Sequence, residues 1–537
     1  MGSASMWTSP PGARVYKACA LALGLVLAVS AYLGSVLAAG QRISGEVTCS
    51  GHPVAGAIVR LQGAEQSTLT DERGLFTLSV PAFNPSLYVT AGKVGYYTNR
   101  ARLLKPDQHL LINLQEIPKD DNKGYQWQDP TPDLKSQDNC GNCHSRIYRE
   151  WTQDAHARST TNPLVQTMYS GTDVRGRPGV GPGYRLDWSD QGNCATCHAP
   201  VASLAQHMDL SDIRGVEGMG VSCDLCHKIE EVRPDLNQPN AAEVIFLRPP
   251  ASAKLLFGPF DDATFLNEVP DFSHSPLFKS SRFCAACHDG SFWGVPVYET
   301  FTEWGKSSYS RLGVQCQTCH MQTTGKFDFF ADPEKGGKIR PPATIASHRM
   351  MGEDPSEFLR NAVAMEASAR VQDRLLTVTV KITNVGAGHD VPTGQPMRNM
   401  ILAVSAAGGQ EQSLRFMAGE SVPAWGGDLA GQPGKGFAKI LLTLNEYATP
   451  THVVNNTTAA EFPSPFWRRN RILSDNRIPA NASDLSSYVF SVPKESGRLS
   501  IRVRLIYRRA FKPLADAKGW DIPDITIATS ELEIEKP

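Results

Sequence analysis

Short runs of alternating apolar and polar residues fill the chain between residues 41 and 117. Clear examples are residues 43–48, 53–61 and 75–80, and turn residues separate one run from the next. A period of two places alternate side chains on one face of a β-strand. Several short strands at this spacing predict a β-sandwich over residues 41–117.

The same period returns near the end of the chain, most clearly at residues 375–383 and 499–507. The pattern predicts a second β-sandwich, which we assign to residues 356–537. This part contains no cysteine.

The centre of the chain, residues 138–355, has few long apolar periods and many Gly, Pro and short polar runs. Such a segment predicts short helices joined by loops, with little aliphatic core of its own. A polar, Pro-containing stretch at residues 118–137 is typical of a linker. We therefore expect a multidomain chain, with a β-sandwich at each end and short helices and loops between them.

One five-residue pattern, C-x-x-C-H, occurs five times in the central segment. It is the attachment sequence for c-type haem: two thiols join the porphyrin, and the next His binds the iron as proximal ligand. The cysteines are Cys140, Cys143, Cys194, Cys197, Cys223, Cys226, Cys284, Cys287, Cys316 and Cys319, and the histidines are His144, His198, His227, His288 and His320.

Other uses of these cysteines explain the pattern less well. A zinc site does not require His directly after every cysteine pair. A thioredoxin-like pair would occur once, beside a βαβ pattern, and disulfides would not need five identical spacings. The sequence therefore favours five covalently bound haem c groups, each containing iron.

The motifs also show an internal repeat. Cys223 and Cys316 are each preceded by Gly-Val and one further residue, and each follows the motif before it at a similar spacing. Two pairs of haems, second with third and fourth with fifth, plus a leading single haem, describe this repeat most simply.

A second axial ligand decides whether a haem is a low-spin electron carrier or a candidate catalyst. Eight histidines remain outside the motifs. Five of them lie in or beside the haem segment and are candidates for the distal position. These are His156, His207, His274, His348 and His389.

Each candidate can instead be a surface or structural histidine. His52 and His109 are interpreted as exposed loop histidines of the first β domain. Methionines near the motifs are alternative ligands that would raise the reduction potential, although Met side chains usually only pack. They are Met208, Met321, Met350 and Met351.

The N-terminus is typical of an export segment. Arg14 and Lys17 precede an uncharged apolar run, and small residues near Ala39 offer a cleavage point. Residues 1–39 are therefore a cleaved signal peptide or, since the run approaches membrane-spanning length, a retained anchor. We expect the protein in the periplasm or at the cell surface, with attachment to the inner membrane if the segment is kept.

The charge of the chain argues against nucleic-acid binding, and the cysteines outside the haem motifs argue against a disulfide framework. The net charge is −1 and no basic block indicates nucleic-acid binding. Ten of the twelve cysteines belong to the haem motifs, and Cys19 lies in the export segment. Cys49 has no partner in the mature chain, so a disulfide framework is excluded.

Two resemblances follow from these motifs. Residues 41–117, with the runs Pro53-Val-Ala-Gly-Ala and Thr70-Asp-Glu-Arg-Gly-Leu-Phe76, resemble the carboxypeptidase regulatory-like domain, which implies a non-catalytic sandwich. Residues 138–350 resemble the multihaem cytochrome c family that includes cytochrome c-554. The first motif with Trp151 and His156, and the run Gly220-Val-Ser-Cys-Asp-Leu-Cys-His227, carry that similarity. It implies closely packed, mostly bis-His haems that pass electrons.

These observations favour an electron carrier over an enzyme. Its partners would be other cytochromes or a quinol oxidase or reductase, and the oligomeric state is open. The first alternative is an oxidoreductase that acts on a small nitrogen or sulfur compound at one open haem. The related nitrite reductases use C-x-x-C-K, which is absent from this sequence. The second alternative is a surface or filament cytochrome, which rests on analogy with other sandwiches.

Overall fold

The computed structural model describes residues 41–80, 83–136, 139–234, 242–264, 271–352, 354–444, 464–494 and 497–535. The predicted export segment with Cys19, and also His452, lie outside these residues. The described residues form two compact units. The first consists of residues 41–116 with Asp261–Thr264, and the second contains the other described residues.

Two β-sheets, one of them mixed, form the first unit. Its strands are β1 (Gln41–Cys49), β2 (His52–Pro53), β3 (Ile58–Leu61), β4 (Ser67–Leu69), β5 (Leu75–Val80), β6 (Tyr88–Gly92), β7 (Tyr96–Tyr97), β8 (Asn99–Arg102), β9 (His109–Asn113) and β10 (Gln115–Glu116). One sheet has the order β2-β1-β5, with β9 parallel to β1, and the other has the order β4-β3-β6-β8. Both sheets contribute to one core that includes Ile43, Val47, Val59, Leu78 and Val89. The predicted N-terminal sheets are confirmed.

The haem-motif segment of the second unit consists of short helices and loops, as predicted. Its α-helices are α2 (Cys140–Cys143), α3 (Ser145–Gln153), α4 (Pro163–Ser170), α5 (Tyr184–Asp187), α6 (Cys194–His198), α7 (Pro200–Leu204), α8 (Cys223–Cys226), α9 (Arg282–His288), α10 (Thr300–Lys306), α11 (Ser308–Arg311) and α12 (Cys316–His320). Short 3-10 turns are η1 (His156–Arg158), η2 (Gly215–Gly218), η3 (Pro276–Lys279), η4 (Pro333–Lys335) and η5 (Pro342–Thr344).

Small strand pairs connect these helices. They are β11 (Ile229–Arg233) with β12 (Glu243–Phe246), β13 (Leu256–Gly258) with β14 (Phe272–His274), and β15 (Gly290–Phe292) with β16 (Val295–Tyr298). The segment predicted as a linker also packs here. Asp121 forms an ion pair with the buried Arg248, and the backbone amide of Gln128 donates to Asp224 at 3.0 Å. These contacts make it part of the second unit.

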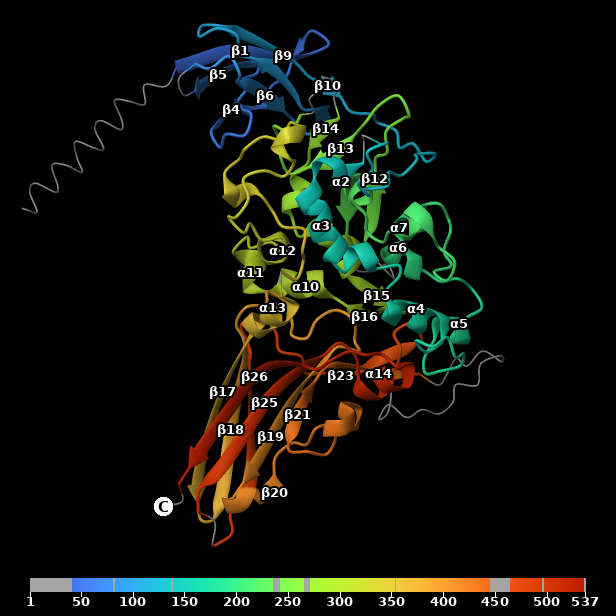
Figure 1. The fold of residues 1–537 in the computed structure, drawn as a ribbon, viewed down its shortest axis with the longest axis vertical. Helices are drawn as coiled ribbons and strands as arrows, with labels where there is room; N and C mark the ends of the chain where they lie inside the picture. The colour runs from blue at the N-terminus through green and yellow to red at the C-terminus, as the bar shows by residue number, and fades with distance from the viewer. Residues whose placement is uncertain are drawn as a thin grey trace, which may run out of the picture. The chain divides into compact units, whose positions relative to one another are not determined.

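The C-terminal part is an antiparallel sandwich (Figure 1). Its elements are α13 (Pro355–Ala362), β17 (Val363–Gln372), β18 (Leu375–Asn384), β19 (Asn399–Ala407), η6 (Gly409–Glu411), β20 (Arg415–Ala418), η7 (Ala424–Leu429), β21 (Gly434–Phe437), β22 (Lys439–Thr443), β23 (Asn470–Asp475), β24 (Ser483–Ser491), β25 (Leu499–Arg508), α14 (Lys512–Lys518) and β26 (Ile525–Ile534). One sheet has the order β17-β18-β24-β20 and the other β21-β19-β25-β26.

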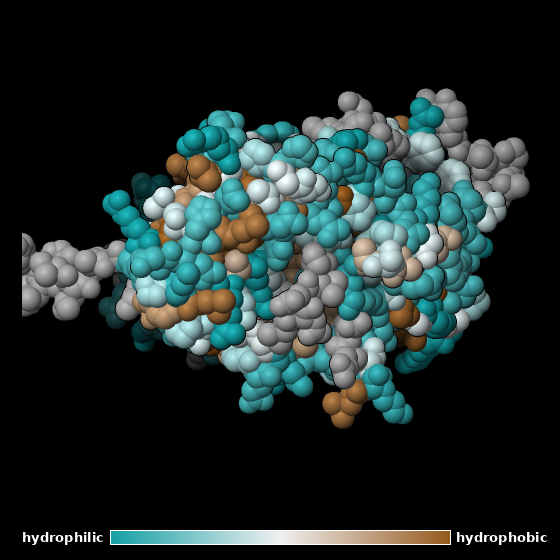
Figure 2. Space-filling model, turned by 90° about the horizontal axis from the view of Figure 1, so that it is seen from above, coloured by the Kyte–Doolittle hydropathy of each residue, from teal (hydrophilic) through white to brown (hydrophobic). Residues whose placement is uncertain are grey.

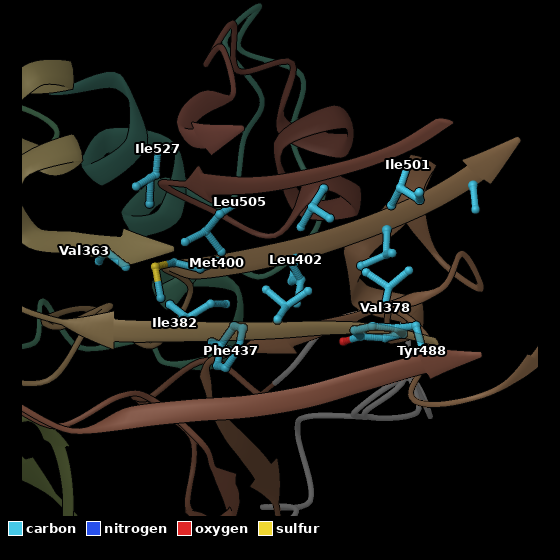
Figure 3. Close-up of a cluster of buried hydrophobic side chains, with 14 of the residues drawn as sticks. Val363, Val378, Ile382, Met400, Leu402, Phe437, Tyr488, Ile501, Leu505 and Ile527 are labelled. Carbon is cyan, nitrogen blue, oxygen red and sulfur yellow. The ribbon is translucent and has the colours of Figure 1, made fainter. Parts of the chain in front are cut away.

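The inward residues of both sheets share one core. Figure 3 shows Val378, Leu402, Phe437 and Tyr488 among the side chains that meet between the layers. These are the apolar positions of the alternating runs, so the period of two in the sequence is the alternation of the pleat. The predicted C-terminal antiparallel sheets are confirmed.

Truncating Leu402 to alanine should lower the free energy of unfolding by about 2–5 kcal/mol, because the side chain is fully buried and leaves a cavity. The same truncation at Leu485, which is 68% exposed, should change it by less than about 0.5 kcal/mol. Denaturant unfolding followed by far-ultraviolet circular dichroism measures both. Equal losses would mean that Leu402 is not part of a packed core.

The surface shown in Figure 2 is mostly hydrophilic, with hydrophobic residues in several small separate groups. Among the described residues, no helix has both the length and the hydropathy needed to cross a bilayer.

Candidate haem centres

Each haem motif lies on a short helix, namely α2, α6, α8, α9 and α12. Residues at i and i+3 share one face of a helix, so both thiols of a motif point to the same side. The histidine follows directly at or beside the helix end. This local geometry suits two thioether bonds to one porphyrin with an imidazole beneath it.

Three motif histidines are fixed by backbone carbonyls that are far away in sequence. The Nδ1–H groups of His144, His227 and His320 donate to the carbonyl oxygens of Phe330, Phe257 and Met350 at 2.9, 2.5 and 2.8 Å. A carbonyl can only accept, so the proton is on Nδ1 and the lone pair is on Nε2. This tautomer presents Nε2 to an iron.

Burial keeps the motif imidazoles neutral, which is the form that binds a metal. It lowers the pKa of His198 to about 4 and that of His288 to about 3. Burial also lowers the pKa of His144, His227 and His320.

His156 lies opposite a motif histidine. Its ring centroid is 6.1 Å from that of His288. Histidine nitrogens bind transition metals at about 2 Å, so two imidazoles on opposite faces of one iron have centroids about 6 Å apart. The Nδ1 of His156 is 2.7 Å from a carboxylate oxygen of Asp154, which leaves its Nε2 for a metal.

His389 has the same relation to the fifth motif. The centroids of His389 and His320 are 6.3 Å apart, with their planes at 21°. The Nδ1–H of His389 donates to the backbone carbonyl of Asp390 at 2.9 Å. Burial lowers the pKa of His389, so this ring is neutral as well.

The loop after β18 carries His389, and a buried network supports this loop. Glu303 of α10 accepts from the backbone amide of Asp390 at 3.2 Å and from the Thr393 hydroxyl at 2.6 Å. The guanidinium of Arg477, itself 4% exposed, pairs with Glu303. The side chain of Asn384 donates to the backbone carbonyl of His389 at 2.8 Å.

His348 is also buried within the haem segment. Burial, together with the neighbouring charges of His227, Arg146 and His144, lowers its pKa to about 3. Its backbone amide donates to Glu150 at 2.8 Å. The structure therefore brings His348 close to the first and third motifs.

His274 and His207 lie in different surroundings. His274 ends β14, where it is paired with Gly258, next to the Phe257 carbonyl that holds His227. His207 lies at the surface, and its two ring nitrogens are 3.0 Å from Glu217 and 2.7 Å from Asp212. Both nitrogens of His207 are thus occupied by carboxylates.

The thiols of different motifs touch each other. The pKa of each of these thiols is shifted by a thiol of another motif beside it: Cys140 by Cys223, Cys197 by Cys287, and Cys284 by Cys316. These contacts join the first motif to the third, the second to the fourth, and the fourth to the fifth. The fourth–fifth pair agrees with the sequence repeat, but the thiol contact of the second motif is with the fourth and not with the third.

The surroundings of Arg146 indicate whether the residues near the first motif could hold a haem. Its side chain is largely buried, and its guanidinium carbon lies 4.3 Å from the Phe327 ring centroid. Two of its nitrogens, Nε and Nη2, are buried without a hydrogen-bond partner among the described residues. Unpaired buried guanidinium nitrogens call for an anion, and the carboxylates of a bound haem would supply one. The residues present therefore fit the group.

Sequence reasoning missed the residues that hold the ligands in place. Glu150, Asp154, Glu303 and Arg477 each contact a histidine or its loop. For the first two a signal existed, because both lie within six residues before His156 in the sequence. Arg477 gave no such signal, since it lies far from every motif along the chain.

The chain is similar to known proteins in one part of its sequence and in its fold. The family described as "Cytochrome c554 and c-prime" matches residues 139–228. A penta-heme cytochrome c552 from Thermochromatium tepidum has a similar fold, with a TM-score of 0.53 and 21% identity. The alignment covers 74% of this chain and 97% of that one. Among curated proteins no match was found. The family match on residues 139–228 spans the first three of the five haem-attachment motifs, so this part of the chain is a cytochrome c554-like multihaem region.

Proposed function

We propose that the protein carries electrons between redox partners outside the cytoplasm through five covalently bound haems. The observation that carries this proposal is the set of thiol contacts between motifs. Because the thiols attach at porphyrin edges, contact between thiols of different motifs brings haem edges together. Bound haem supplies reversible one-electron chemistry at its iron.

The proposed axial ligands come from the ring geometry. His156 serves the iron of His288, and His389 serves that of His320, because both ring pairs have the spacing of a bis-His site. His348 and His274 serve the irons of the first and third motifs, beside which they lie. Two imidazole ligands give a low-spin haem suited to electron transfer.

The partners and the location are part of the same proposal. Haem is attached to c-type cytochromes outside the cytoplasm, and residues 1–39 have the composition of an export segment. We propose a periplasmic or cell-surface protein, held at the membrane if that segment is retained. Other cytochromes, or a quinol oxidase or reductase, are the proposed partners.

A second candidate function comes from His207. With both of its nitrogens bound to carboxylates, no described histidine of this unit remains for the iron of His198. A haem with an open axial position binds small molecules. The second motif is therefore the proposed place for an oxidoreductase activity on a small nitrogen or sulfur compound.

A spectroscopic titration of the holoprotein tests both candidates. The pyridine haemochrome should return five haems per chain. The ferric electron paramagnetic resonance spectrum should contain mainly low-spin signals, and one haem should bind carbon monoxide after reduction. The change His207→Ala should leave both measurements as they are, because His207 binds carboxylates at the surface.

The outcomes separate the two functions. If no haem binds carbon monoxide, the second motif is closed and the oxidoreductase is excluded. If most haems are high-spin, the electron-carrier proposal fails. If His207→Ala creates a new high-spin signal, His207 is a ligand and the proposed ligand set is wrong.

A further inference from the structure

Two carboxylates lie at the C-terminal end of α3. Glu150 is in the last turn of this helix, and Asp154 is the residue that follows it. Glu150 accepts from the backbone amide of His348 at 2.8 Å and also pairs with Arg146. Asp154, which is 7% exposed, lies deeper in the haem segment.

One oxygen of Asp154 holds His156 twice. Its Oδ1 accepts from the backbone amide of His156 at 3.0 Å and lies 2.7 Å from the ring Nδ1. The backbone bond fixes the position of the residue, and the ring bond fixes the orientation of the imidazole. This orientation places the ring opposite His288.

The other oxygen of Asp154 reaches the fifth motif. Its Oδ2 accepts from the backbone amide of Met350 at 2.9 Å, and the carbonyl of the same Met350 accepts from Nδ1–H of His320 at 2.8 Å. The carboxylate of Asp154 thus contacts the proposed ligand His156 directly and supports the motif histidine His320 through Met350.

The charge of that carboxylate has a definite electronic effect. A carboxylate that accepts a hydrogen bond from Nδ1 makes the imidazole a more basic ligand. A more basic ligand stabilises the ferric iron over the ferrous one, so it lowers the reduction potential. The effect is stronger inside the protein than in water because screening is weaker there.

We propose that Asp154 is a positioning residue that lowers the reduction potential of the fourth-motif haem and holds the proximal histidine of the fifth. This inference rests on the proposed ligation of the fourth-motif iron by His156. A purely structural role as a turn cap would require the same backbone bonds but would not depend on the carboxylate charge.

The change Asp154→Asn tests the role of the charge, because asparagine has nearly the same shape. In redox titrations of the holoprotein, the reduction equilibrium constant of one haem should rise at least about tenfold, which is about 59 mV for one electron. The haem content and the number of low-spin haems should stay at the wild-type values. A smaller shift of a second haem, from the fifth motif, is also expected.

Asp173→Asn is the matched control. Asp173 is 2% exposed and, like Asp154, accepts from backbone amides, here those of Arg175 and Arg177 at 2.9 Å. Its side chain bonds to Arg177 instead of a histidine. The Asp173→Asn variant should leave the reduction potential of every haem unchanged. Equal shifts in both variants would overturn the proposal.

The variant His156→Ala separates the proposed ligation of the fourth-motif iron from the proposed effect of the Asp154 charge. If it leaves the number of low-spin haems at the wild-type value, the proposed ligation of the fourth-motif iron is wrong. If it creates a high-spin haem while Asp154→Asn moves no potential, the ligation stands and the role of the Asp154 charge is refuted.

Discussion

Replacing His389 with alanine is expected to turn one low-spin haem of the ferric protein into a high-spin haem. The ring of His389 lies 6.3 Å from that of His320, centroid to centroid, and alanine cannot bind iron in its place. The open position should then bind carbon monoxide after reduction, one equivalent more than in the wild type. Electron paramagnetic resonance and the Soret band measure both changes.

The variant His109→Ala is the control for this experiment. His109 lies on β9 of the first unit, where it is exposed and contacts the Ser44 hydroxyl at 3.5 Å. Its removal should leave the spectrum as it is. A His389→Ala protein with unchanged spin states would show that His320 has another partner, and the ligand assignment for the fifth motif would be abandoned.

Replacing Arg477 with methionine should lower the free energy of unfolding by about 3–5 kcal/mol. The Arg477 side chain is 4% exposed and pairs with Glu303, which is equally buried. It also contacts Asp475 at 2.8 Å and Asp390 at 3.4 Å. Methionine fills similar space but leaves these carboxylates without their cation, and an uncompensated buried charge is costly.

Arg502→Met is the matched change at the surface. Arg502 pairs with Glu531 at 2.9 Å, but both side chains are 63% exposed. Exposed pairs contribute less than about 1 kcal/mol, so this variant should unfold at nearly the wild-type denaturant concentration. If Arg477→Met is as mild as Arg502→Met, the buried network does not stabilise the His389 loop.

The arrangement of sheets, short helices and sheets could be predicted because it follows from local patterns. Alternation at residues 375–383 becomes β18, whose inward residues Leu376, Val378, Val380 and Ile382 are all fully buried. The resemblance of the first domain to the carboxypeptidase regulatory-like domain stays a prediction. Local patterns could not predict how residues 118–137 pack, because the ion pair of this segment with Arg248 joins residues far apart along the chain.

The distal histidines show where sequence reasoning stops. The candidates His156, His207 and His389 were equivalent along the chain, since each is simply a histidine near the motifs. In the structure, His156 and His389 face motif histidines, while His207 is bound by Asp212 and Glu217 at the surface. The carboxylates of Asp212 and Glu217 occupy the ring nitrogens of His207. Their positions beside His207 depend on the fold of η2 and the loop before it.

The sequence alone predicted where haem would be attached, because each attachment needs only five consecutive residues on one short helical turn. It also determined the β-structure at both ends, since a period of two is a local property of the strand. Tertiary structure decided which motifs are neighbours and which histidines lie opposite them. The two axial ligands proposed for one iron come from separate segments, such as His389 after β18 and His320 on α12, and only the folded chain brings those segments together.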